Sequence, residues 1–186
     1  MQDRMWTFSN LLSLSRILLV APLAYCLLSD VADKRLWVAL IIALAVLTDF
    51  LDGYFARKRH EVSELGKIID PVADKIAVGA TASLMVWTGD LPFWYLAFVV
   101  GRDILILLGG IYIKNKKMII VQSNWPGKIA VNAIALVLLL SILRVEMLEE
   151  FRQVTIWASM VLMTLSFASY VQRLFIGHGL GKKVVS

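Results

Sequence analysis

The sequence predicts an all-α, polytopic membrane protein with six transmembrane helices and both termini in the cytoplasm. Hydrophobic residues make up 59% of the 186-residue chain, whereas a soluble domain has roughly 45–50%. They occur in long runs, and the basic residues concentrate in alternate connections between those runs. No repeat, linker or low-complexity tract divides the sequence. We therefore expect a single transmembrane domain over residues 1–186.

Six apolar runs are close to the ~20 residues that a helix needs to cross the hydrocarbon of a bilayer. Because lipid cannot satisfy free backbone groups, each run is expected to be helical. The runs cover about residues 10–29, 36–59, 68–88, 92–113, 128–143 and 152–175.

Each run has its own boundary signals. The first is interrupted by polar residues such as Arg16 and does not resemble a cleavable signal peptide, so we expect it to be retained. The second ends in the basic segment 57–59, and the fourth ends in the lysine-rich segment 114–117. The third contains Asp70-Pro71, a pair that either starts a helix or kinks a longer one. The fifth follows the segment 124–128, and the sixth reaches Arg173.

The charges in the connections predict the orientation, because cytoplasmic loops carry an excess of lysine and arginine. With a cytoplasmic N-terminus, the cytoplasmic segments hold Arg4, Arg57, Lys58, Arg59, Lys67, Lys114, Lys116, Lys117, Lys128, Arg173, Lys182 and Lys183. The opposite connections hold Lys34, Arg35, Arg144 and Arg152, together with Asp30, Asp33, Asp90, Glu146, Glu149 and Glu150. The basic belt and the pI near 9.4 favour anionic lipid headgroups, and no nucleic-acid partner is expected.

Four aspartates are the most informative feature of this apolar chain. The pattern is Asp49-x2-Asp52-Gly53-x2-Ala56-Arg57-x8-Gly66-x3-Asp70-x3-Asp74. A carboxylate at membrane depth costs about 2.5–3.5 kcal/mol, so it usually faces a cavity, a partner or a metal. The spacing places each pair of aspartates on one helical face, and a short connection brings the two helices together. Surface charge or pairing with Lys75 is the simpler alternative, but apolar sequence flanks Asp49 and Asp74 on the membrane side.

Four converging carboxylates would repel one another unless a cation lies between them. Oxygen ligands suit Mg²⁺ or Mn²⁺, and Ca²⁺ could also occupy such a site. Two bound cations would polarise phosphoryl oxygens, and a carboxylate could accept a proton from an attacking hydroxyl. The residues alone therefore predict metal-dependent phosphoryl chemistry at the membrane interface. Gly53 and Ala56 leave room for a substrate or for close helix packing, and Arg57 is either a ligand or a membrane anchor.

The whole aspartate motif resembles that of the CDP-alcohol phosphotransferase family, and the six-helix outline is similar. The resemblance implies a phosphatidyltransferase that moves the phosphatidyl group of CDP-diacylglycerol to an alcohol and releases CMP. It implies that Asp49, Asp52, Asp70 and Asp74 bind two divalent cations, and that Asp74 is also the catalytic base. It further implies contacts between the CDP-lipid and a larger set of residues, namely Gly53, Ala56, Arg57, Ser63 and Gly66. A bacterial-type inner membrane, with the active site facing the cytoplasm, is the expected location.

The first run strengthens this resemblance. Asn10, Ser13 and Arg16 lie in a segment similar to the family's Asn-Leu-x-Thr-x-x-Arg opening, with serine in place of threonine and Ser9 in place of the usual preceding proline. We therefore place all three among the residues that bind the CDP-lipid. An interfacial anchor is the alternative role for Arg16.

Arg102 and Lys128 are the candidate residues for binding the acceptor. Arginine is a good phosphate ligand, although Arg102 and Asp103 can also neutralise each other. Lys128 lies near the start of a predicted helix, where an anion is favoured. Both residues suggest a small phosphorylated alcohol. The segments 70–75 and 124–128 resemble the phosphatidylglycerophosphate synthase branch, which uses glycerol 3-phosphate, whereas Arg102-Asp103 resembles the cardiolipin synthase branch, which uses phosphatidylglycerol. Inositol phosphate is a further alternative.

A cation transporter is the alternative from another functional class. Transporters often have matching polar breaks in two repeated halves, but here the aspartates gather on the second and third runs alone. The family resemblance implies a homodimer, to which Gly79-Ala80 or Gly109-Gly110 could contribute close helix contacts. The single cysteine, Cys26, excludes an intramolecular disulfide framework.

Overall fold

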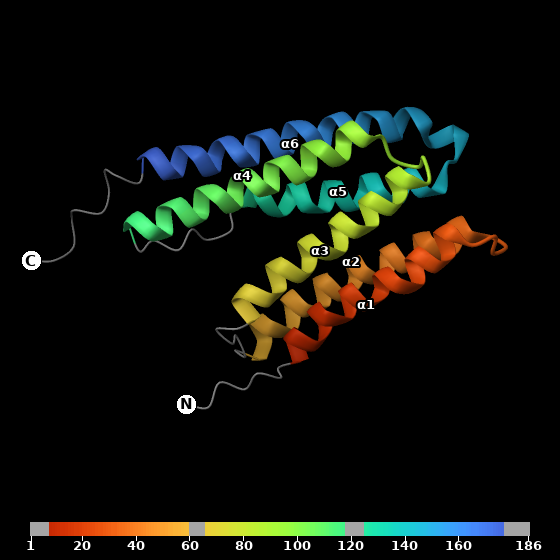
Figure 1. The fold of residues 1–186 in the computed structure, drawn as a ribbon, viewed down its shortest axis with the longest axis horizontal. Helices are drawn as coiled ribbons and strands as arrows, with labels where there is room; N and C mark the ends of the chain where they lie inside the picture. The colour runs from red at the N-terminus through yellow and green to blue at the C-terminus, as the bar shows by residue number, and fades with distance from the viewer. Residues whose placement is uncertain (1–7, 60–65, 118–124, 177–186) are drawn as a thin grey trace, which may run out of the picture. The chain divides into compact units, whose positions relative to one another are not determined.

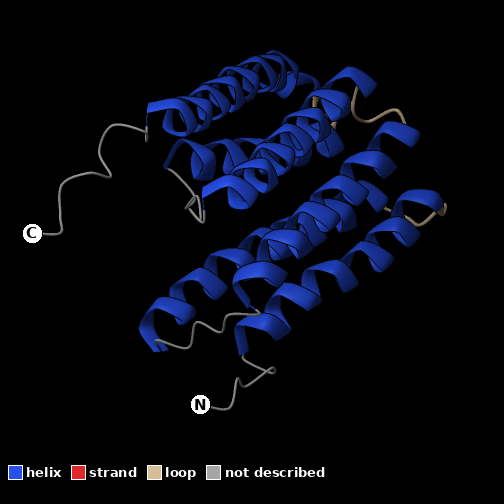
Figure 2. Cartoon of the chain, turned by 60° about the vertical axis from the view of Figure 1, so that its left-hand side comes forward, coloured by secondary structure: helices blue, strands red, loops and turns tan. Residues whose placement is uncertain are grey.

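The computed structural model describes residues 8–59, 66–117 and 125–176, and all the long elements in these ranges are helices (Figures 1 and 2). They are α1 (Phe8–Leu28), α2 (Lys34–Arg59), α3 (Gly66–Trp87), α4 (Phe93–Lys117), α5 (Trp125–Leu143), a 3-10 turn η1 (Glu146–Leu148) and α6 (Glu149–Ile176). The described residues include no strand. The all-α prediction is therefore confirmed, and each expected run corresponds to one helix.

The chain divides into two compact units. The first contains residues 1–96 and 138–146, and the second contains residues 97–137 and 147–186. Within the first unit, α1 packs against both α2 and α3. Apolar side chains on these helices, such as Leu23, Val38, Ile42 and Met85, are almost completely buried. Their close packing contributes van der Waals contacts between the helices.

In the second unit, α4 and α6 are joined by two polar contacts. The Tyr170 hydroxyl donates to the Ile106 carbonyl oxygen at 3.1 Å, and the Arg102 guanidinium donates to Ser166 Oγ at 2.9 Å. Ile156 and Met163 on α6 are buried. These contacts fix the register of α4 against α6.

Apolar side chains also cover much of the outer surface. Leu18, Trp87 and Phe93 are 72%, 83% and 71% exposed, which is unusual for a protein surrounded only by water. Among the described residues, one helical stretch, Glu146–Gln172, is long and apolar enough to cross a membrane by length and composition. The arrangement of six spans with cytoplasmic termini stays a prediction.

A glycine ends α3 and sets the direction of the following loop. Gly89 has a φ of 74°, which is easily adopted only without a side chain. Its amide donates to the Val86 carbonyl at 3.1 Å, and the Asp90 amide donates to the Met85 carbonyl at 2.8 Å. This pair of bonds is a Schellman motif, which satisfies the last carbonyls of the helix. Asp90 therefore lies directly after the end of α3.

Candidate active site

Three charged side chains from three helices meet within the first unit. Arg16 on α1 forms ion pairs with Asp49 on α2 and with Asp74 on α3. The Arg16 Nε atom lies 3.0 Å from Asp74 Oδ1, and Nη1 donates a hydrogen bond to Asp49 Oδ1. We call these three residues the acidic cluster. The structure thus brings together residues that are 33 and 58 positions apart in the sequence.

The helices that carry the acidic cluster explain why the three groups converge. Since α1 packs on both α2 and α3, a side chain on α1 can reach a carboxylate on each neighbour. Ala73, which precedes Asp74, is only 2% exposed, so α3 presents a small side chain to its neighbours at this turn. An arginine is long enough to bridge the two carboxylates, and its planar fork offers several donors.

The acidic cluster carries one more negative charge than positive charge. The Arg16 side chain is 5% exposed, whereas Asp49 and Asp74 are 50% and 37% exposed. A buried cation requires opposite charges close by, because desolvation would otherwise be very costly. The two carboxylates supply that compensation and remain partly open to solvent. This arrangement can accept a further cation.

The other two aspartates of the motif occupy neighbouring helical turns. Asp52 lies one turn after Asp49 on α2, and Asp70 lies one turn before Asp74 on α3. Since α3 begins at Gly66, Asp70-Pro71 lies inside the helix rather than at its first position, which answers the question left open by the sequence. The side chains of Asp52 and Asp70 lie outside the described residues, so the complete ligand set stays a prediction.

The predicted CDP-lipid residues are placed only by their helices. Asn10 and Ser13 are on α1, Gly53, Ala56 and Arg57 are on α2, and Gly66 is the first residue of α3. Ser63 falls outside the described residues, as do the side-chain positions of the other six. Arg16 is thus the one member of this predicted group whose contacts the structure describes, and it contacts the aspartates.

Arg102 lies in the second unit and is already paired. It bonds to Asp103 Oδ1 at 2.8 Å and to Ser166 Oγ at 2.9 Å, and its side chain is 13% exposed. The sequence-based alternative of an Arg102–Asp103 pair is therefore confirmed. Lys128 lies in the first turn of α5, and its side chain is outside the described residues. The acceptor roles of both residues stay predictions.

Asp49 and Asp74 fit a divalent cation on chemical grounds. Both offer carboxylate oxygens, the ligands preferred by Mg²⁺ and Mn²⁺. They come from different helices and are close enough to hold one guanidinium between them. Their predicted neighbours Asp52 and Asp70 would add two further carboxylates on the same pair of helices.

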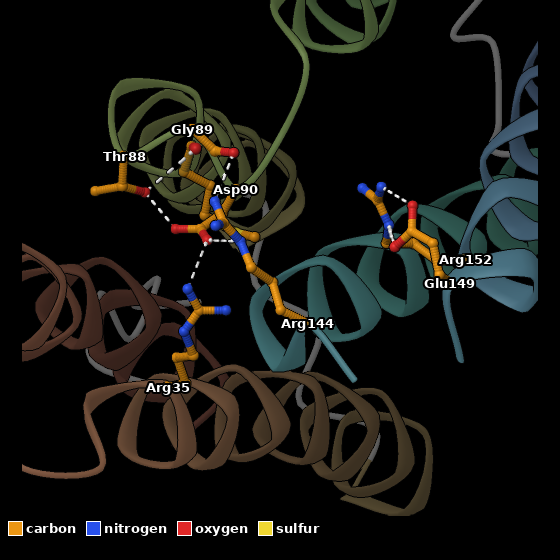
Figure 3. Close-up of polar contacts among 8 residues, drawn as sticks. Arg35, Thr88, Gly89, Asp90, Arg144, Glu149 and Arg152 are labelled. Carbon is orange, nitrogen blue, oxygen red and sulfur yellow. Dashed lines mark hydrogen bonds and ion pairs between the residues drawn. The ribbon is translucent and has the colours of Figure 1, made fainter. Parts of the chain in front are cut away.

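A second charged group was not recognised as a unit from the sequence. Asp90, Arg35 and Arg144, called here the basic cluster, come from the loop after α3, the first turn of α2 and the segment after α5 (Figure 3). From the sequence they are recognisable only as loop charges that predict the topology. The turn segment Thr88-Gly89-Asp90 before Pro92 was the available signal, because it places an acid directly after a helix end.

Known proteins resemble this chain over most of its length. Residues 6–165 match the model of the CDP-alcohol phosphatidyltransferase family. The CDP-diacylglycerol–glycerol-3-phosphate 3-phosphatidyltransferase of Aquifex aeolicus is 34% identical over 177 residues, which cover 89% of this chain and 94% of the relative. The Bacillus subtilis protein of the same name is 28% identical, covering 91% and 95%. A cardiolipin synthase (CMP-forming) of Streptomyces coelicolor is 29% identical, covering 69% and 61%.

Proposed function

Because this chain belongs to the CDP-alcohol phosphatidyltransferase family, we propose that it transfers the phosphatidyl group of CDP-diacylglycerol to glycerol 3-phosphate. The acceptor hydroxyl oxygen forms a bond to the phosphorus that carries diacylglycerol, and the bond from this phosphorus to CMP breaks. The hydroxyl proton passes to a carboxylate, and the products are phosphatidylglycerophosphate and CMP. The observation that supports this function best is the convergence of Asp49 and Asp74 on one cationic group.

Asp74 is the proposed base of the reaction. Its carboxylate is 37% exposed, so an acceptor can reach it, while the contact with Arg16 Nε fixes its direction. General bases commonly contribute about 10²–10⁴-fold to a rate. Arg16 therefore acts as a positioning residue for Asp74 and Asp49 before the substrates bind.

Two divalent cations, Mg²⁺ or Mn²⁺, are proposed to bind to Asp49, Asp52, Asp70 and Asp74. When bound, they supply positive charge to the phosphoryl oxygens and to the leaving CMP. Gly53, Ala56 and Arg57 on α2 are proposed to contact the cytidine diphosphate. Asn10, Ser13, Arg16, Ser63 and Gly66 are proposed to contribute to binding the CDP-lipid. The small residues leave the backbone of α2 open to a flat or bulky group.

Coverage of the relatives favours glycerol 3-phosphate as the acceptor. The chain spans 94% and 95% of two glycerol-3-phosphate phosphatidyltransferases but 61% of the Streptomyces cardiolipin synthase. Phosphatidylglycerol is the second candidate acceptor, supported by that relative and by the Arg102–Asp103 pair. Arg102 and Lys128 are proposed to bind the phosphate of the acceptor.

The proposed setting is a bacterial-type inner membrane, with six spans and the aspartates at the cytoplasmic side. Exposed apolar side chains such as Leu18, Leu44 and Leu165 support a lipid environment. A homodimer is expected from the family resemblance and is part of this proposal.

Release of CMP from CDP-diacylglycerol in detergent tests the proposed function. We expect turnover with glycerol 3-phosphate and Mg²⁺ or Mn²⁺, and loss of turnover when a chelator removes the metal. Phosphatidylglycerol, inositol phosphate, inositol and serine serve as competing acceptors. Metal-independent turnover would contradict the cation proposal, and preferential use of phosphatidylglycerol would reassign the acceptor.

The role of Arg102 is tested by comparing Arg102→Ala with Ser166→Ala. Both variants remove the 2.9 Å contact between α4 and α6, but only the first removes the guanidinium. We expect Arg102→Ala to raise the KM for glycerol 3-phosphate more than the KM for CDP-diacylglycerol. Ser166→Ala should leave both values nearly unchanged. Equal effects of Arg102→Ala on both substrates would contradict acceptor recognition.

A further inference from the structure

Residues from three separate parts of the first unit meet around the buried carboxylate of Asp90. Asp90 follows α3, Arg35 is the second residue of α2 and Arg144 follows α5. Arg144 Nε lies 2.8 Å from Asp90 Oδ1, and Arg35 Nη2 lies 3.9 Å from the same oxygen (Figure 3). Thr88 donates its hydroxyl to Asp90 Oδ2 at 2.5 Å. Asp90 is thus fully engaged, with a side chain that is only 7% exposed.

The basic side chains around Asp90 carry excess positive charge. Arg35 and Arg144 are 42% and 46% exposed and share one carboxylate. Lys34 is adjacent, and its Nζ atom lies 3.8 Å from Asp30, which is fully exposed. An exposed pair of this kind contributes little. The local charge therefore favours an anion.

A cavity of ≈ 370 Å³ lies beside these residues. Its polar lining comprises Lys34, Arg35, Arg144, Thr88 and Asp90, so three cations and one anion face it. Its apolar lining comprises Leu27, Leu28, Trp87 and Ile142. A second cavity of ≈ 410 Å³ also uses Lys34 and Arg35. The first cavity combines a cationic side with an apolar side.

The apolar side continues to the molecular surface. Trp87 is 83% exposed and Leu28 is 59% exposed, whereas Leu27 and Ile142 are buried. A tryptophan that has apolar residues on one side and polar residues on the other is characteristic of the membrane interface, between the lipid headgroups and the hydrocarbon. A ligand with a phosphate and long hydrocarbon chains would match both sides of the cavity.

We propose that this cavity binds the phosphate group of an anionic phospholipid through Lys34, Arg35 and Arg144, with the acyl chains along Leu28 and Trp87. Guanidinium groups bind phosphate through paired, charge-assisted hydrogen bonds. Arg35 and Asp49 are separated by about 20 Å along α2, so this site is distinct from the acidic cluster. The proposed lipid site lies at the end of α2 that is opposite to the acidic cluster. Binding of this lipid is therefore expected to be independent of catalytic turnover.

Photo-cross-linking of the full-length protein in detergent tests the proposal. Photoreactive phosphatidylglycerol should label peptides that contain Leu28 or Trp87, and photoreactive phosphatidylcholine should label them less. The Lys34→Gln/Arg35→Gln double variant should lower this labelling about tenfold, which corresponds to the loss of one strong ionic contact. Labelling by photoreactive CDP-diacylglycerol elsewhere in the chain should be unchanged in that variant.

Arg152→Gln is the matched control. Arg152 is also an arginine with a carboxylate partner, Glu149 (Figure 3), but it does not line the cavity. Labelling should survive this substitution, and Lys34→Gln alone, which retains both arginines on Asp90, should give an intermediate loss. Equal labelling by both lipids, or full labelling of the double variant, would overturn the proposal. Displacement of the lipid by an equal concentration of inorganic phosphate would overturn the lipid assignment.

Discussion

The acidic and basic clusters of the first unit are built with opposite charges. In the acidic cluster, one arginine whose side chain is 5% exposed forms ion pairs with two carboxylates that are 50% and 37% exposed. In the basic cluster, one aspartate whose side chain is 7% exposed forms ion pairs with two arginines that are 42% and 46% exposed. In both clusters the charge in the minority is the buried one. The comparison shows how a single unit can offer a site for cations and a site for anions.

The physical reason is the cost of desolvation. A charge removed from water needs more than one partner to recover its hydration, so the buried ion collects two opposite charges. The partners stay half-exposed and keep a net charge of their own sign. That remaining charge is available to a ligand, which is a metal in the proposed active site and a phosphate in the proposed lipid site.

Asp74→Asn should have the largest effect, because it removes the proposed base. We expect CMP release to fall about 10²–10⁴-fold, while the protein remains folded and membrane-inserted. The control is Glu150→Gln, the same change of an acid to its amide at an exposed position of α6. A wild-type rate for Asp74→Asn would remove the residue from the base role.

Asp90→Asn should be the most destabilising change in the basic cluster. The amide keeps the size of the side chain but removes the carboxylate that Arg35 and Arg144 share. We expect the free energy of unfolding to fall by about 1–3 kcal/mol, measured by chemical denaturation in detergent. CMP release by the folded fraction should be retained, in contrast to Asp74→Asn. An unchanged stability would show that the cluster does not hold these three parts of the first unit together.

Arg16→Gln should destabilise the protein by about 1 kcal/mol in the absence of metal, because its partners Asp49 and Asp74 are partly solvated. Saturating Mn²⁺ should reduce this loss, since a cation between the carboxylates replaces the missing charge. Thermal unfolding with and without Mn²⁺ measures both the loss of stability and its reduction by the metal. Arg16→Lys, which keeps the charge, is the control, and a loss that does not respond to metal would argue against a shared cation site.

Gly89→Ala should cost about 1 kcal/mol of stability, no more than Arg16→Gln, because alanine is strained at a φ of 74°. A methyl group at this position would meet nothing closer than Arg144 Nη2 at 3.9 Å, so the cost is conformational rather than steric. Gly79→Ala is the matched control, at a glycine inside α3 rather than after its end, where an added methyl group would meet no atom within 4 Å. It should stabilise the protein slightly, since alanine favours the helix. If both substitutions destabilised the protein, or both stabilised it, the conformational explanation for Gly89 would be contradicted.

Much of the fold and of the candidate site was predictable from the sequence. In a membrane, a long apolar run must form its backbone hydrogen bonds within the run. The positions of the six predicted runs, and their helical structure, could therefore be predicted. Helical periodicity alone predicts that Asp49 and Asp52 share one face of a helix. It makes the same prediction for Asp70 and Asp74. The family motif then pointed to phosphatidyl transfer. Helix ends were less predictable, because Asp70-Pro71 could either start a helix or lie inside one, and α3 begins at Gly66.

Partners from different helices required the tertiary structure. The sequence predicts that Arg16 binds the CDP-lipid, but it does not predict that Arg16 pairs with Asp49 and Asp74, which follows from the packing of α1 against both α2 and α3. The basic cluster depends on three residues that are remote in the sequence and on the backbone turn at Gly89. Local periodicity determines which face a residue occupies, whereas helix packing determines which charges meet there. The sequence alone thus determined the helices and the proposed chemistry, and the tertiary structure decided how each buried charge is compensated.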